Sequence, residues 1–203
     1  MKTIKTTIAV IVASLFATVA LANNKVYIEQ AGSTNTVTIT QIGSTNRVGD
    51  VGLNNQSKIT GSNNALTVLQ QGSGNILDYT VTGSGNTVGK TVTGDTNQIT
   101  FTCGDGTTAC TNVTSTMTIT GDTNTVTSTI KGTAITNTLT ITGDSNTFTS
   151  SMSGSGATLG HHLIASVLGT SNTHTVTQSG SVSTTVNILT NGSSNTVTVA
   201  TGN

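Results

Sequence analysis

Residues 30–43, QAGSTNTVTITQIG, decide the fold of this chain. They contain the phrase Asn-x-apolar-x-apolar-x-Gln-x-Gly, and complete copies of it lie at residues 24–32, 35–43, 64–72 and 172–180. Further copies at 75–83, 124–132 and 146–154 keep the frame but replace the Gln. A repeat of about eleven residues cannot bury a core by itself, so its copies must stack on one another.

The turn between repeats reads Gly-x-x-Asn and recurs along the whole chain, including one copy at Gly52/Asn55. Glycine supplies a backbone conformation that other residues resist, and asparagine tolerates a similar one. We therefore expect turns at the following glycines: Gly32, Gly43, Gly72, Gly83, Gly94, Gly121, Gly143 and Gly192.

Apolar residues alternate with threonine inside each repeat, and this period of two predicts β-strands. Alternate side chains lie on one face of a strand, so Val37 and Ile39 point inward while Thr36 and Thr38 point outward. Two strands and two turns make a coil of about 22 residues, with neighbouring coils about 4.8 Å apart. The sequence thus predicts an all-β fold, a parallel β-solenoid with cross-β stacking and about eight coils in one domain, residues 23–203.

The inward positions also include asparagine and glutamine. A buried amide without a partner costs about 1–3 kcal/mol, but an amide both donates and accepts, so identical residues in successive coils can bond along the axis. Such a ladder stabilises the stack and specifies its register. The residues predicted to form it are Asn24, Gln30, Asn35, Gln41, Asn64, Gln70, Asn172 and Gln178.

Residues 1–22 have the features of a Sec signal peptide. Lys2 and Lys5 precede an apolar run over residues 8–20, and the run ends in Ala20-Leu21-Ala22. This run is shorter than the roughly 20 residues that a membrane anchor needs, so we favour cleavage before Asn23 over a retained anchor. We expect a secreted chain, at the cell surface or outside the cell.

The expected mature chain has few charges. Five basic residues stand against seven acidic ones, a net charge of −2. It therefore has neither a basic face for nucleic acid nor a polybasic patch for anionic lipid. With no Pro, no Trp and 2% aromatic residues, it also cannot build a core on large side chains.

Cys103 and Cys110 flank a Gly-rich loop, and in a secreted chain we expect them to form a disulfide. The repeat loses its phase there, from residue 103 to 115, and again from 155 to 167, where we expect loops or distorted coils.

Three histidines and one lysine fit the repeat poorly. His161 and His162 are expected to be exposed in a loop, whereas His174 occupies an inward slot. Strict phase turns Lys90 inward, and because an unpaired buried charge is costly we expect a bulge or twist that carries it to solvent.

The chain offers no group of residues suited to catalysis. No nucleophile, base and orienting residue stand together, and no Gly-rich loop opens a helix. We predict no enzyme activity, no cofactor, no metal site and no small-molecule substrate.

The arrangement Gln-x-Gly-x-x-Asn-x-Val-x-Ile-x-Gln at residues 30–41 resembles the curlin repeat, the unit of the curli fibre subunits that bacteria secrete as a functional amyloid. The likeness is specific over roughly residues 23–81 and looser beyond. It implies an extracellular fibre subunit exported through an outer-membrane pore, with roles in adhesion and biofilm matrix. The implied partners are other copies of the chain and a nucleator subunit.

The ends of the repeat array independently favour assembly. A solenoid exposes an unpaired strand at each end, and monomeric solenoids cover it with a cap, charge or Pro. Residues 24–30 and 195–203 resemble repeat strands and carry few such devices, so the two ends predict head-to-tail growth.

Two other functions remain open. Outward Thr-x-Thr faces at 36–40, 116–120 and 138–142 resemble those of ice-binding proteins, although we expect threonine on most strands rather than in one regular file. A carbohydrate-active β-helix or solenoid adhesin would need clustered carboxylates or Arg. The candidates Asp95, Asp122 and Asp144 instead sit singly in turns.

Overall fold

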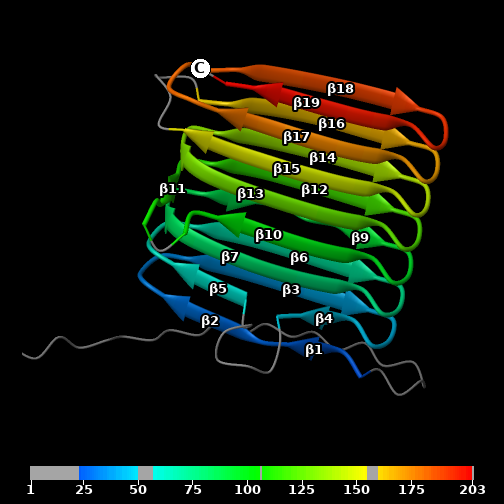
Figure 1. The fold of residues 1–203 in the computed structure, drawn as a ribbon. Coiled ribbons are helices and arrows are strands. Elements are labelled where there is room, and N and C mark those ends of the chain that lie inside the picture. Colours follow the sequence, from blue (N-terminus) through cyan, green and yellow to red (C-terminus); the bar gives the residue numbers. More distant parts are fainter. Residues whose placement is uncertain (1–22, 50–56, 106, 155–159, 203) are drawn as a thin grey trace, which may run out of the picture.

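The computed structural model describes residues 23–49, 57–105, 107–154 and 160–202. These residues form one stack of parallel strands without a helix (Figure 1). The predicted all-β fold, a parallel β-solenoid, is therefore confirmed. The predicted signal peptide, residues 1–22, and the turn at Gly52/Asn55 lie outside the described residues.

The described strands form two sheets, one of 11 strands and one of 8. The first sheet contains β1 (Lys25–Val26), β2 (Ile28–Ala31), β4 (Arg47–Val48), β5 (Ser57–Thr60), β7 (Ile76–Ser84), β10 (Gln98–Cys103), β11 (Cys110–Thr111), β13 (Thr125–Thr133), β15 (Thr147–Gly154), β17 (Thr173–Ser179) and β19 (Thr196–Thr201). The second sheet contains β3 (Thr36–Ile42), β6 (Ala65–Gln71), β8 (Thr87–Val88), β9 (Val92–Thr93), β12 (Thr114–Thr120), β14 (Thr136–Thr142), β16 (His162–Leu168) and β18 (Thr185–Asn191).

The chain passes alternately through the two sheets, whose strands run in opposite directions in Figure 1. Along the stack the path β1-β4-β7-β10-β13-β15-β17-β19 gives the first sheet eight levels, and β3-β6-β8-β12-β14-β16-β18 gives the second sheet seven. The described residues therefore make seven coils and a further half, close to the eight that we expected. β1 and β19 lie at opposite ends of the stack.

Coil length varies because residues are inserted at particular levels. Asparagines at equivalent positions of successive coils are 22 residues apart in regular coils. The separation rises to 29, 27 and 26 residues where the chain contains the segment between β4 and β5, the loop between β10 and β11, and the segment before β16. The strand pattern resumes after each insertion.

This resumption corrects two predictions. We expected irregular chain up to residue 115 and up to residue 167, but β12 begins at Thr114 and β16 at His162. The pairing of β12 with β14, and of β16 with β18, is regular over seven residues each. The strand that follows an insertion can still pair in phase, so the disturbance is shorter than the sequence pattern indicated.

The core is a narrow layer between the two sheets. In β17 exposed and buried residues alternate strictly, with His174, Val176 and Gln178 inside and threonines outside. The same inward rows contain Phe101, Phe148 and a series of Ile, Leu and Val residues. Strands at the ends are less covered: the apolar side chains of β3 and β19 are only half-buried. Each end therefore lacks the coil that would complete its core.

Candidate assembly site: polar ladders and open sheet edges

Asparagines at the start of each of the eight levels of the first sheet form a continuous ladder through the stack. From Asn75 onward, the backbone N–H and the side-chain Nδ2 of each asparagine donate to the Oδ1 of the asparagine in the preceding coil, at 2.9–3.1 Å. The ladder, which we call the long ladder, consists of Asn24, Asn46, Asn75, Asn97, Asn124, Asn146, Asn172 and Asn195.

Six of the eight asparagines also donate from Nδ2 to the carbonyl oxygen of a turn glycine. The Nδ2 of Asn97 donates to the carbonyl oxygen of Gly121 in the next coil at 2.8 Å, and Asn75 does the same to Gly94 at 2.7 Å. The interior asparagines are almost fully buried. Burial in this row is tolerable because amide groups and backbone groups satisfy one another.

A second, shorter ladder runs at the start of the second-sheet strands. Asn64 donates to Asn35 Oδ1, and Asn86 donates to Asn64 Oδ1, through both backbone and side-chain nitrogen atoms. It ends where the backbone N–H of Val113 donates to Asn86 Oδ1 at 2.9 Å. In the second half of this row asparagine gives way to Val113, Ile135, His161 and Thr184, and the side-chain contact there is between His161 Nδ1 and Thr184 Oγ1 at 2.8 Å.

The glutamines stack less than we expected. Gln41 Nε2 donates to Gln70 Oε1 at 2.8 Å, which makes one glutamine pair. Gln30, however, lies opposite Ile59 in the register, and Gln178 lies between Met152 and Thr201. The prediction that glutamines continue as a ladder is therefore wrong at Gln30 and Gln178, because adjacent copies of the phrase alternate between sheets and do not stack on one another.

The buried Gln178 finds other partners. Its Nε2 donates to the carbonyl oxygens of His162 and Thr184 and to the Thr184 hydroxyl, at 3.0–3.1 Å. It thus ties the first sheet to the turn that precedes β18.

Sequence reasoning missed most of the long ladder. Of its eight members, our ladder residues included only Asn24 and Asn172, because we required the complete phrase with Gln. The signal was present: Asn46, Asn75, Asn97, Asn124, Asn146 and Asn195 all end a Gly-x-x-Asn turn.

The turn glycines have positive φ, and all of them except Gly192 also lie in close contact with the next coil. All eight that we named have φ between 104° and 144°. A Cβ at Gly72 would lie 2.1 Å from the carbonyl oxygen of Gly94, and one at Gly83 would lie 1.7 Å from that of Cys110. Neither distance leaves room for a side chain. Both the positive φ and the lack of space therefore require glycine at these two turns.

The second positive φ in each turn is not on the asparagine, as we had assumed, but on the residue before it. Thr96, Thr123 and Ser145 have φ near 60° at this position, and Gly74 and Gly85 occupy it in two other turns. The asparagine itself does not have positive φ and directly precedes the strand.

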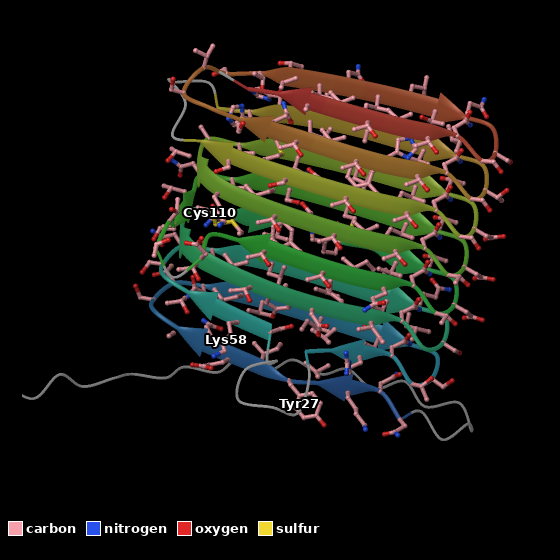
Figure 2. All side chains as sticks on the ribbon, in the orientation of Figure 1. Tyr27, Lys58 and Cys110 are labelled. Carbon is pink, nitrogen blue, oxygen red and sulfur yellow. A yellow bond between two sulfur atoms is a disulfide. The ribbon has the colours of Figure 1, made fainter. Side chains whose placement is uncertain are left out.

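Cys103 and Cys110 form a disulfide, and both side chains are fully buried. Cys103 ends β10 and Cys110 begins β11, so the bond closes the loop between two segments of the same level (Figure 2). Asp105 also holds the loop, because its carboxylate pairs with Lys131 and accepts the backbone N–H groups of Thr108 and Thr107. The ion pair with Lys131 and these hydrogen bonds keep the pKa of the Asp105 carboxyl well below its usual value.

Lys90 is inside the stack, contrary to our expectation that a bulge would carry it to solvent. It is 2% exposed, its Nζ donates to Ser115 Oγ at 3.0 Å, and it lies 3.9 Å from the centroid of the Phe101 ring. Burial lowers the pKa of its amine to about 7. The amine can therefore enter the core by losing its proton, an option that we did not consider.

The prediction for His174 is confirmed, and those for His161 and His162 are wrong. His174 is buried in an inward slot, where it stacks on Phe148 and bonds Thr190 Oγ1 at 2.8 Å; burial lowers its pKa. His161 is also buried, with Nδ1 2.8 Å from Thr184 Oγ1, so its predicted exposure is wrong. His162 begins β16 rather than lying in a loop.

The acidic turn residues also stack. The carboxylate of Asp95 accepts the backbone N–H of Ser73, that of Asp122 accepts Asp95 N–H, and that of Asp144 accepts Asp122 N–H, at 2.6–2.8 Å. In the described part of the chain no three His, Cys, Asp or Glu side chains gather as metal ligands would, and no helix is long and apolar enough to cross a membrane.

The outer faces of the sheets consist largely of threonine. We expected no regular file, but the register aligns Thr100, Thr127, Thr149, Thr175 and Thr198 in one row across the first sheet. Parallel pairing without slippage converts the local Thr alternation into rows along the stack.

Comparison with known families identifies one similarity. The family model of the Curlin associated repeat matches residues 22–43, and the resemblance to the curlin repeat is thus confirmed over that segment. This match covers the phrase with which the solenoid starts. No curated protein and no solved structure matches the chain.

Proposed function

We propose that the chain is a structural subunit that stacks end to end into extracellular cross-β fibres. The observation that carries the proposal is that both ends of the solenoid expose edge strands, β2 and β3 at one end and β18 and β19 at the other, with the same inward and outward pattern as the interior strands. An unpaired strand edge with a matching edge on another copy favours continued stacking.

The family match and the composition support this function. The Curlin associated repeat is a unit of structural proteins, and the match lies in the first coil. The few charges, net −2 after residue 22, give little repulsion between copies. Adhesion and biofilm matrix are the roles that the curlin resemblance suggests.

The proposal includes a route out of the cell. Residues 1–22 direct Sec export and are removed, and residues 23–203 then form the single solenoid domain. An outer-membrane pore secretes the chain, a nucleator subunit starts polymerisation, and other copies of the chain are the main partners.

The test is the behaviour of the purified polypeptide of residues 23–203. We expect it to gain thioflavin fluorescence with time, to form unbranched fibres in electron micrographs, and to give the strand-spacing reflection at about 4.8 Å along the fibre axis. A polypeptide that stays monomeric through prolonged incubation contradicts the proposal.

Ladder residues at the N-terminal end of the stack give a sharper test. Asn35→Ala with Gln41→Ala removes the second-sheet amides of the first coil, which bond Gly61, Asn64 and Gln70. We expect fibre growth to slow several-fold, whereas Thr38→Ser, on the exposed side of the same strand, leaves the rate unchanged. Equal rates for all three proteins would refute the role of the ladder.

Ice binding is the second candidate, because the threonine rows on the first sheet give a flat, regular array of hydroxyl and methyl groups. Thermal hysteresis of the monomer, abolished by Thr127→Leu and Thr149→Leu, would support it. Its absence at concentrations where fibres form would exclude it.

A further inference from the structure

The two ends of the solenoid are uneven. The first sheet has eight levels and the second has seven, and both the first level, β1 and β2, and the last, β19, belong to the first sheet. Because the chain rises from sheet to sheet as it winds, the first sheet extends about half a strand spacing beyond the second at each end. A joint between two copies must accommodate this step.

A joint in which each sheet continues into the same sheet does not fit. If β1 and β2 of the next copy lie about 4.8 Å above β19, then β3 of that copy lies about 9.6 Å above β18. One strand is missing from the second sheet at every joint. The backbone groups of β18 and β3 that face the gap would be left unpaired inside the fibre, at a substantial cost.

A half turn about the solenoid axis removes the gap. Since each regular coil consists of two eleven-residue halves, such a rotation superposes the first sheet on the second, with inward side chains still inward. We propose that, in fibres of residues 23–203, each copy is rotated by half a turn relative to the one before, so that β18 pairs with β1 and β2 of the next copy and β19 pairs with its β3. This inference rests on the proposed function.

The β19–β3 contact continues the interior pattern. Asn195, the last rung of the long ladder, would accept N–H groups from Asn35 of the next copy, as Asn172 accepts them from Asn195 within the chain. Val197 would then meet Val37, and Val199 would meet Ile39. These four side chains are the partly buried apolar residues that pack against the margin of the core, so the joint completes their burial.

The β18–β2 contact is equally consistent. Val186 and Ile188, which point inward, would lie against Val26 and Ile28 of the next copy. On the outer face, Leu189, which is 73% exposed, would lie beside Glu29. The parallel direction of pairing found throughout the chain is kept at both contacts.

A tail-to-tail dimer would also fill the step, because β19 of each copy could lie on β18 of the other. It would make those strands antiparallel, and it would place Asn195 beside the end of a strand rather than beside an asparagine. Such an isologous contact closes on itself and produces no fibre.

Paired cysteines distinguish the joints. Glu29→Cys with Leu189→Cys places thiols on adjacent strands across the half-turn joint, whereas Glu29→Cys with Ala200→Cys does so across the in-phase joint. All three positions are exposed, and neighbouring parallel strands bring their Cα atoms within disulfide range. Both double variants lose the same Glu29–Lys58 ion pair, so each is the matched control of the other.

Fibres are grown while these thiols are reversibly blocked. The thiols are then unblocked and oxidised, the fibres are digested, and the linked peptides are identified by mass spectrometry. We expect the 29–189 link and a ladder of covalent oligomers on a denaturing gel. A 29–200 link, or fibres with neither link, overturns the half-turn joint while the fibre function stands. Discrete dimers in place of fibres overturn both. An unsubstituted chain that never assembles overturns both.

Helical reconstruction of fibres of the unsubstituted chain provides a second measurement that no substitution can disturb. The half-turn joint gives a rise per copy of 7.5 strand spacings, about 36 Å, with a rotation near 180° plus the accumulated sheet twist. The in-phase joint gives 8 spacings, about 38 Å, without the half turn. The second set of values contradicts the proposal even if neither cysteine variant assembles.

Discussion

Asn97, in the middle of the long ladder, shows how much a single asparagine contributes to the stability of the stack. Its Oδ1 accepts the backbone N–H and the Nδ2 of Asn124, and its Nδ2 donates to the carbonyl oxygen of Gly121. Asn97→Ala leaves these buried groups without their partner, at roughly 1–3 kcal/mol for each. We expect the free energy of unfolding of the monomer, measured in urea, to fall by at least about 3 kcal/mol.

The matched control is Asn191→Ala, the same substitution at an exposed residue of β18. We expect it to change the free energy of unfolding by less than about 0.5 kcal/mol. If the two variants were equally stable, the ladder would contribute nothing beyond the backbone pairing.

Lys90 is the residue whose charge should make stability depend on pH. Its pKa is about 7 in the folded chain and 10.5 when unperturbed, so between these values the unfolded chain binds the extra proton. The free energy of unfolding should therefore rise with pH from about 7 to 10.5. Below pH 7 the folded chain bears the full cost of burying the protonated Lys90 amine. At about 1.4 kcal/mol per pKa unit, this penalty is of the order of 5 kcal/mol.

We expect Lys90→Met to be more stable than the parent chain at pH 7, with the difference shrinking as the pH approaches 9.5. Measurements should stop there, because Tyr79, whose pKa is raised by burial, becomes destabilising once the unfolded phenol ionises. Lys131→Met removes a surface lysine paired with Asp105 and keeps Lys90, so its difference in stability from the parent chain should not shrink in this way. A slope shared by both variants would assign the effect to another group.

At the scale of the strand and loop, the disulfide compensates for an interrupted strand. β10 ends at Cys103 and β11 begins at Cys110, and the bond closes a loop of seven residues' separation. Loop-closure entropy assigns such a cross-link about 2–3 kcal/mol. We expect Cys103→Ala with Cys110→Ala to lower the free energy of unfolding by this amount.

Reduction supplies the control for that variant. A thiol reductant should destabilise the parent chain by a similar amount and leave the double alanine variant unchanged. A parent chain that is insensitive to reductant would contradict a stabilising role for the bond.

The strands and turns were predictable because their signals are local. A period of two fixes which side chains of β3 or β17 point inward, and glycine with a following asparagine marks each turn. What could not be read locally was which residue lies above which. Gln30 and Gln41 belong to different sheets, so the stacking partner of each depends on residues 20 to 30 positions away and on where insertions loop out.

The buried residues that break the pattern were the hardest to predict. Lys90 follows the inward phase, yet we moved it to the surface because we assumed that it would keep its charge. The neutral amine, with Ser115 Oγ and the Phe101 ring as neighbours, satisfies the same phase without a bulge to solvent. Local phase was the better guide there than the usual charge state.

For the molecule as a whole, the proposed assembly depends on parallel pairing between its two unlike ends. Val197 and Val199 are half-buried at the C-terminal end, whereas Thr196 and Thr198 of the same strand are exposed. Val197→Lys with Val199→Lys places charges in the joint, where a following copy would bury them at high cost. We expect this variant to fold but not to elongate by itself.

The polarity of stacking gives this variant a second property. Its N-terminal end is unaltered, so it can add to the exposed C-terminal end of a growing fibre and then block it. We expect one variant chain among tens of parent chains to shorten the fibres and to slow the rise of thioflavin fluorescence. Thr196→Lys with Thr198→Lys adds the same charge to the outer face of β19. It should elongate by itself, and it should not shorten the fibres of the parent chain. Equal inhibition by the two variants would mean that net charge, and not the end of the stack, controls assembly.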